Sequence, residues 1–122
     1  MGSQYDASQQ NMDQITEMIE LAEGLDSCNR HMDKAFKNSE NPAFTEERRN
    51  DFLGYAWEHL EESVYILSRM REMPAKTLLT CINILEHDQS QIEFPRNDEE
   101  RSMYEGIDII KNQIYKIIEE AG

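Results

Sequence analysis

The sequence has few of the residues that break helices or that cross-link small folds. Its 122 residues include five Gly, three Pro and two Cys. So few Gly and Pro disfavour a β-rich fold, which needs many tight turns. Cys28 and Cys81 show no CxxC or Cys/His zinc spacing, so they do not indicate a disulfide framework or a metal site. They predict reduced thiols in a cytoplasmic protein.

Long apolar runs and basic residues are also scarce. No apolar stretch approaches the roughly 18 residues of a membrane-spanning helix, and the polar N-terminal residues are unlike a signal peptide. The chain has 12 Lys and Arg against 25 Asp and Glu, a net charge of −13. Direct binding to nucleic acid or to an anionic membrane is therefore disfavoured, because phosphate groups would be repelled. A basic protein surface is the expected partner.

Helical periodicity is abundant. Near the C-terminus, apolar residues alternate spacings of four and three: Met103, Ile107, Ile110, Ile114, Ile117 and Ala121. This spacing places them on one stripe of a helix that begins at Asn97 or Asp98 and ends at Glu120. The same pattern recurs twice upstream: Ile15, Met18, Ala22, Leu25, Asn29, Met32 and Phe36, then Leu53, Ala56, Leu60, Ser63, Leu67 and Met70.

These stripes predict a first helix over Ser8–Lys37 and a second helix that ends near Glu72. Thr45 is expected to cap the second helix, and Pro74 to end it, because a residue before Pro avoids helical geometry. A shorter third helix is expected from Ala75 to His87. The loop from 88 to 97 follows, with Ile92 and Phe94 expected to tuck under the core.

The expected fold is therefore an all-α antiparallel helical bundle of about four helices, three long and one short. Residues 1–7 are expected to form a flexible polar lead, and residues 8–121 a single domain. Asn29 is the polar exception on the first stripe. A buried Asn can fix register or partner number, although an Asn at the bundle edge would simply contact water.

Catalytic patterns are weak. Glu58-x-x-Glu61 and Glu105-x-x-Asp108 superficially resemble the magnesium-binding acid pairs of helical nucleotide pyrophosphohydrolases, but they mostly face away from the apolar stripes. Cys28 precedes His31 by three residues, a spacing that could lower the thiol pKa. No glycine-rich segment lies nearby to form an oxyanion hole. We therefore expect no enzyme activity, no catalytic residue, no metal and no cofactor.

A five-residue segment, His31-Met32-Asp33-Lys34-Ala35, resembles the phospho-accepting motif of histidine phosphotransfer domains. The resemblance implies that His31 accepts a phosphoryl group, that Lys34 balances its charge and that the small Ala35 admits a receiver domain. The chain departs from the family in lacking the usual Leu before the Lys and the Gly-rich surroundings. A solvated histidine on a helix flank is the simpler alternative.

Acidic residues dominate the first helix. From Met1 to Asn29 there are six acids and no Lys or Arg. The candidate partner-binding residues are Asp13, Glu17, Glu20, Glu23 and Asp26. The first three are expected opposite the apolar stripe, as an exposed acidic face. Such a face could bind a basic protein by charge complementarity, could imitate a phosphate backbone, or could only be solvated.

The favoured function is therefore a non-enzymatic, acidic helical protein that binds another protein as a small regulator or inhibitor. The alternatives are a phosphotransfer domain using His31 and a nucleic-acid mimic that inhibits a basic protein. Apolar residues in excess of one stripe favour self-association as a homodimer, or a partner groove. These residues are Ile19, Leu21, Tyr55, Trp57 and Val64.

Overall fold

A computed structural model of the chain describes residues 2–92 and 94–121, with side chains described from Asn11 onward. Within these ranges the chain forms four α-helices and no strand, which confirms the all-α bundle. The helices are α1 (Gly2–Ser39), α2 (Glu46–Arg71), α3 (Ala75–Ser90) and α4 (Asp98–Ala121).

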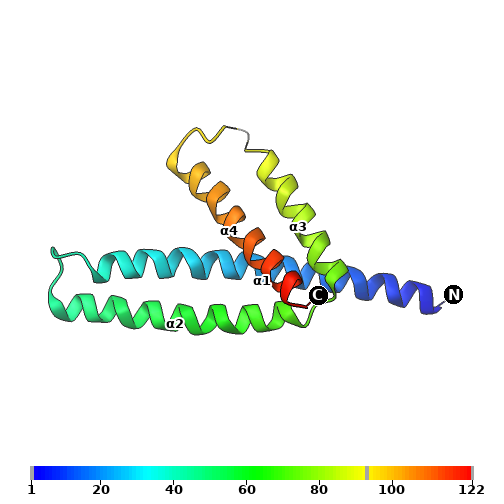
Figure 1. Cartoon of the computed structure of the whole chain (residues 1–122), viewed down its shortest axis with the longest axis horizontal. Helices are drawn as coiled ribbons and strands as arrows, with labels where there is room; N and C mark the ends of the chain where they lie inside the picture. Colours follow the sequence, from blue (N-terminus) through cyan, green and yellow to red (C-terminus); the bar gives the residue numbers. More distant parts are fainter. Residues whose placement is uncertain (1, 93, 122) are drawn as a thin grey trace.

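The four helices form two hairpins of unequal length. α1 and α2 lie antiparallel along most of α2, and α3 and α4 form a second, inclined pair that packs against one part of the first (Figure 1). The end of the long hairpin that carries the α1–α2 turn extends beyond α3 and α4 (Figure 1). The molecule therefore has a covered region, where all four helices meet, and a two-helix tip.

The predicted cap of α2 is confirmed. The backbone N–H of Arg48 donates to Oγ1 of Thr45 at 3.2 Å, which satisfies one of the free amide groups at the helix start. Glu46 and Glu47 follow in the first turn, where the helix dipole favours acids. α2 ends at Arg71, close to the predicted boundary, and Pro74 directly precedes α3.

Two helices are longer than expected. α1 begins at Gly2 and so includes residues 2–7, for which the sequence suggested a flexible lead; no Pro interrupts this segment. α3 continues past His87 to Ser90. The last turn of α3 is held by Gln89, a buried residue whose Nε2 donates to Oδ1 of Asp108 at 2.6 Å and to the carbonyl of Tyr104 at 3.2 Å.

The core lies where the inclined pair crosses the long hairpin. Its fully buried side chains come from all four helices and include Met18, Leu25, Met70, Ile82, Ile110 and Ile114. Cys28 and Cys81 are both buried and both free, as expected from the sequence. Asn29 is half-buried, and its Nδ2 donates to Oε1 of Gln113 in α4 at 3.2 Å, so it joins the first and fourth helices.

Several residues expected in the core are exposed. Phe94 is 81% exposed, so the prediction that it tucks under the core is wrong, while Ile92 is half-buried. Met103 and Ala121 lie at the ends of the α4 stripe and are exposed because the stripe is longer than the helix crossing. Further predicted stripe positions at the tip are also exposed, namely Phe36 and Leu53.

None of the described helices is both long enough and apolar enough to cross a lipid bilayer.

Candidate functional site

The five acidic residues predicted to bind a partner lie on more than one side of α1. Asp13 and Glu20 are exposed. Glu17 is half-buried against α2, where its Oε1 accepts from Nη2 of Arg69 at 2.8 Å. That ion pair joins Glu17 to α2, while the side chain of Glu17 stays 41% exposed.

The other two acids face the inclined pair. Glu23 and Asp26 line a cleft of about 150 Å³ whose remaining walls come from α1, α3 and α4 and are mostly apolar. Oδ2 of Asp26 also pairs with Nη2 of Arg30 at 3.1 Å. Glu17 and Asp26 therefore each have an internal basic partner, and the role of the set in partner binding stays a prediction.

Exposed apolar side chains recur along one face of α2 toward the tip of the long hairpin. Leu67 and Arg71 line a cleft together with α4 residues, so this face of α2 is the one that α4 covers. The same face continues toward the tip at spacings of three and four, through Val64, Leu60, Trp57 and Leu53. Beyond α4 nothing in the described chain covers it: Trp57 is 58% exposed and Val64 is 56% exposed.

α1 carries an exposed apolar residue on the side that faces α4. Asn29 contacts α4 through Gln113, and Phe36 lies two helical turns further along the same side. Phe36 is 42% exposed. We refer to Phe36, Leu53, Trp57, Leu60 and Val64 as the tip face.

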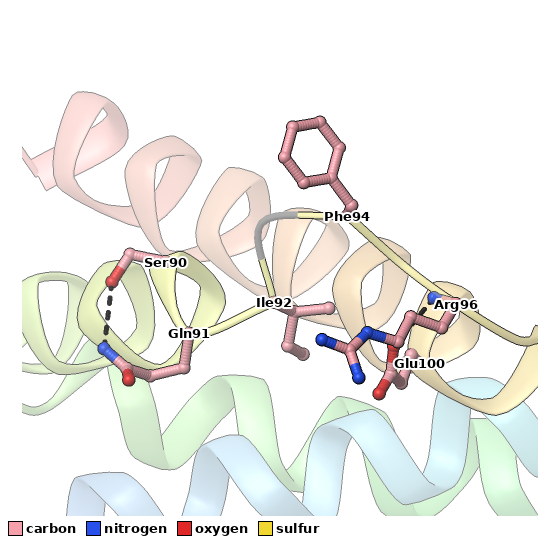
Figure 2. A pocket seen from close by; sticks show the side chains of 6 residues that line it. All are labelled: Ser90, Gln91, Ile92, Phe94, Arg96 and Glu100. Carbon is pink, nitrogen blue, oxygen red and sulfur yellow. Dashed lines mark hydrogen bonds between the residues drawn. The ribbon is translucent and has the colours of Figure 1, made fainter.

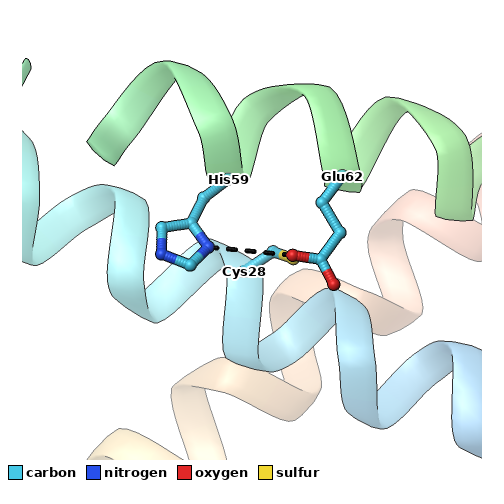
Figure 3. Close-up of side chains that lie close together, drawn as sticks. All are labelled: Cys28, His59 and Glu62. Atoms are coloured by element: carbon cyan, nitrogen blue, oxygen red, sulfur yellow. Dashed lines mark ion pairs between the residues drawn. The ribbon is translucent and has the colours of Figure 1, made fainter. Parts of the chain in front are cut away.

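A second cluster lies between α1 and α2. The thiol of Cys28 comes from α1, and the side chains of His59 and Glu62 reach down to it from α2 (Figure 3). One donor atom from each residue lies within 4.8 Å of the other two. Nδ1 of His59 is 3.9 Å from Oε2 of Glu62. Among the described residues, these three side chains form a group of potential metal ligands with converging donor atoms. The acid pairs Glu58/Glu61 and Glu105/Asp108, from which no metal site was expected, are not part of such a group.

The thiol of Cys28 is protonated at neutral pH. Burial, and then the negative charge and hydrogen bond of Glu62, raise the pKa of Cys28 to about 11. The spacing of Cys28 and His31 in the sequence had suggested the opposite effect, namely that His31 lowers the pKa of the Cys28 thiol. The difference arises because the carboxylate of a second helix approaches the thiol, and the sequence spacing along one helix does not reveal it.

His31 belongs to the edge of this cluster. Its ring stacks on that of His59 with centroids 4.9 Å apart and an interplanar angle of 16°. Its Nδ1 lies 2.7 Å from the carbonyl oxygen of Ser27. Because a carbonyl only accepts, Nδ1 carries the proton and Nε2 holds the lone pair of the neutral ring. His31 is exposed, and stacking on the ring face leaves the nitrogen atoms at the ring edge accessible, so its role as a phospho-acceptor stays a prediction.

A hollow of about 700 Å³ lies at the α3–α4 connection (Figure 2). Two of the polar side chains that line it, those of Glu100 and Ser90, form hydrogen bonds with nearby backbone groups. Oε2 of Glu100 accepts from the backbone N–H of Arg96 at 2.7 Å, and Oγ of Ser90 donates to the carbonyl of His87 at 2.6 Å. Phe94 points away from the helices (Figure 2). Among the described residues that line this hollow, the polar contacts given are local, and we assign it no ligand.

Sequence reasoning identified the Cys28–His31 spacing and considered His59 with Glu62 only as a poorer phosphotransfer motif, so it did not place these two residues beside Cys28. A signal was present, since Cys28-x-x-His31 and His59-x-x-Glu62 are both spaced to share a helix face. The register of the two helices was needed to bring the pairs together. Comparisons with protein-family models, curated proteins and solved structures find no match to this chain.

Proposed function

We propose that the protein acts by binding protein, without catalysis of its own, and that the tip face is its principal contact surface. The observation that carries this proposal is the uncovered apolar surface at Phe36, Leu53, Trp57 and Val64. Stable helical domains bury each apolar stripe against a second layer. At the tip of the long hairpin, the described chain supplies only one layer.

We propose a second copy of the chain as the occupant of the tip face. Two tips related by a two-fold axis would each supply two helices, so that they complete a four-helix bundle. The charge distribution supports this partner. Residues 30–61 carry five basic and seven acidic residues, a net of −2, so the other residues carry −11 of the total of −13. Repulsion between copies is therefore concentrated away from the tips.

The acid-rich remainder of the dimer would then face outward and favour a basic protein by charge complementarity. In this proposal the dimer is a small regulator or inhibitor of such a protein. Charge reversal at the exposed Glu20 and Glu23 is expected to weaken binding to a basic probe such as poly-lysine and to reduce its salt dependence, while the dimer stays intact.

Sedimentation equilibrium over a range of protein concentrations tests the dimer. The wild-type chain is expected to self-associate, and Trp57→Glu or Val64→Glu to shift it to monomer, because each buries a charge in the tip face. Tyr65→Glu is the matched control, since Tyr65 is 64% exposed on another side of α2. A wild-type monomer at all concentrations, or a dimer indifferent to both tip substitutions, would overturn the proposal.

A further inference from the structure

We propose that Cys28, His59 and Glu62 bind one zinc ion, which joins α1 to α2 where the long hairpin leaves the covered region. This inference is independent of the tip face. It rests on the convergence of three different donor types from two helices, with their donor atoms within 4.8 Å of one another (Figure 3). Cys28 lies on α1 and the other two residues lie on α2, so no local sequence motif contains all three.

The donor set selects the metal. Thiolate, imidazole and carboxylate are the three side-chain ligands that zinc takes in proteins. Magnesium and calcium prefer sites made of oxygen alone, so a buried sulfur disfavours them. Zinc also has no redox chemistry, so its binding requires no oxidant or reductant.

The geometry requires a modest contraction. Tetrahedral zinc with bond lengths near 2.0–2.3 Å places neighbouring donor atoms roughly 3.3–3.7 Å apart. Nδ1 of His59 and Oε2 of Glu62 are 3.9 Å apart, and the sulfur of Cys28 lies within 4.8 Å of one donor atom of each residue. Small side-chain rotations close these distances without moving the helices. On binding, the proton of the Cys28 thiol passes to solvent and the sulfur lone pair forms the bond to zinc.

The surroundings give the ion access and orient one of its ligands. Glu62 is exposed and His59 half-buried, so the ion can enter from solvent while Cys28 holds it on the buried side. The stacked ring of His31, itself held by its hydrogen bond to Ser27, restricts the plane of the His59 ring. Three protein ligands leave a fourth position for water or for a further side chain.

Titration of the metal-free, full-length chain with cobalt tests the proposal, because Co²⁺ occupies zinc sites and reports its ligands optically. One cobalt per chain is expected, with a thiolate-to-cobalt charge-transfer band that zinc abolishes by displacement. Zinc affinity is then measured by competition with a chromophoric chelator.

The chain contains a matched control for each ligand. Cys28→Ala, His59→Gln and Glu62→Gln are compared with Cys81→Ala, His87→Gln and Glu61→Gln. The first three are expected to weaken zinc binding by more than the roughly 10–100-fold that loss of an outer-shell contact costs. The controls are expected to leave affinity unchanged, since none of these residues belongs to the cluster.

Weak binding that is equal in all six variants, or cobalt binding without a thiolate band, would show that zinc merely associates with the acidic surface. Either result overturns the site. Circular dichroism of each variant guards against loss of fold. Glu62 is exposed and His59 is half-buried, so substitution of either residue is expected to leave the fold intact. These two variants therefore test the site even if Cys28→Ala unfolds.

Discussion

The two ends of the long hairpin carry the same kind of apolar pattern but bury it differently. In the covered region, Met18, Leu25 and Met70 are fully buried beneath α3 and α4. At the tip, Phe36 and Leu53 occupy positions on the same two stripes and remain exposed, and so does Trp57 beside the second stripe. Periodicity therefore predicts which side of a helix is apolar, but it does not tell whether another helix covers that side.

The difference follows from helix length and inclination. α1 has 38 residues and α3 has 16, so at 1.5 Å per residue they are about 57 Å and about 24 Å long. α3 and α4 also slope away from the long hairpin (Figure 1). α4, with 24 residues, is nearly as long as α2, with 26, so for α4 it is the inclination that keeps the helix from the tip (Figure 1).

The largest expected effect is a difference between the two regions in how much an alanine substitution lowers the free energy of unfolding. Ile114→Ala is expected to lower the free energy of unfolding by about 2–5 kcal/mol, because Ile114 is fully buried where the helices cross. Leu53→Ala at the tip is expected to cost less than about 1 kcal/mol in dilute solution. Urea denaturation measures both.

If the tip dimerises, the loss in free energy of unfolding caused by Leu53→Ala grows with protein concentration, because association stabilises the folded state by mass action. Equal losses for Ile114→Ala and Leu53→Ala in dilute solution would show that the two regions do not differ as described.

A second effect concerns the two thiols. Burial raises the pKa of Cys81 from 9.0 to about 11. The folded state thus keeps a proton that the unfolded chain releases. The contribution of the Cys81 thiol to the free energy of unfolding is fully present below about pH 9. It falls as the pH rises to about 11, by at most about 3 kcal/mol. Urea denaturation across this pH range should show the decline, and Cys81→Ala should reduce it.

The thiol of Cys28 provides the contrast with Cys81. Its pKa is also raised to about 11, first by burial and then by Glu62, whereas burial alone acts on Cys81. Glu62→Gln is therefore expected to lower the pKa of Cys28 and to speed its alkylation at alkaline pH. The alkylation rate of Cys81 should not change. A parallel change at both thiols would contradict the assignment.

The smallest expected effect compares two glycines. A methyl group at Gly54, in the tip, meets nothing within 4 Å. Gly54→Ala should raise the free energy of unfolding by roughly 0.5–1 kcal/mol through helix propensity. At Gly106 the methyl would lie 2.5 Å from Oδ1 of Asp26 and 3.2 Å from Nη2 of Arg30. Gly106→Ala must displace that ion pair, so its gain should be smaller or absent.

Thermal denaturation of the two alanine variants tests this difference, and equal stabilisation by both would show that α4 does not approach α1 so closely.

Much of the fold could be predicted because it depends on local chemistry. Thr45 caps α2 through its own hydroxyl, and Pro74 restricts the residue before it wherever the chain goes. The end of α3 could not be placed in the same way. It depends on Gln89, whose hydrogen bonds reach Asp108 and Tyr104 in another helix.

The candidate sites were less predictable than the fold. Trp57 and Val64 were recognised as apolar residues in excess of one stripe, and both are exposed on the tip face. The apolar stripe of the first helix placed Phe36 in the core, because periodicity along one helix does not indicate how far α4 covers it. Glu17 was expected on an exposed face, but its partner Arg69 lies 52 positions away in the sequence.

The sequence by itself determined that the chain is helical, where most helices begin and end, which sides of them are apolar, and that the protein is strongly acidic. These properties follow from residue spacing, capping and charge, which act within a few residues of one another. Only the tertiary structure decided that the tip stays uncovered and that Cys28, His59 and Glu62 converge. Both depend on the register and inclination of helices, which are set by packing between distant segments.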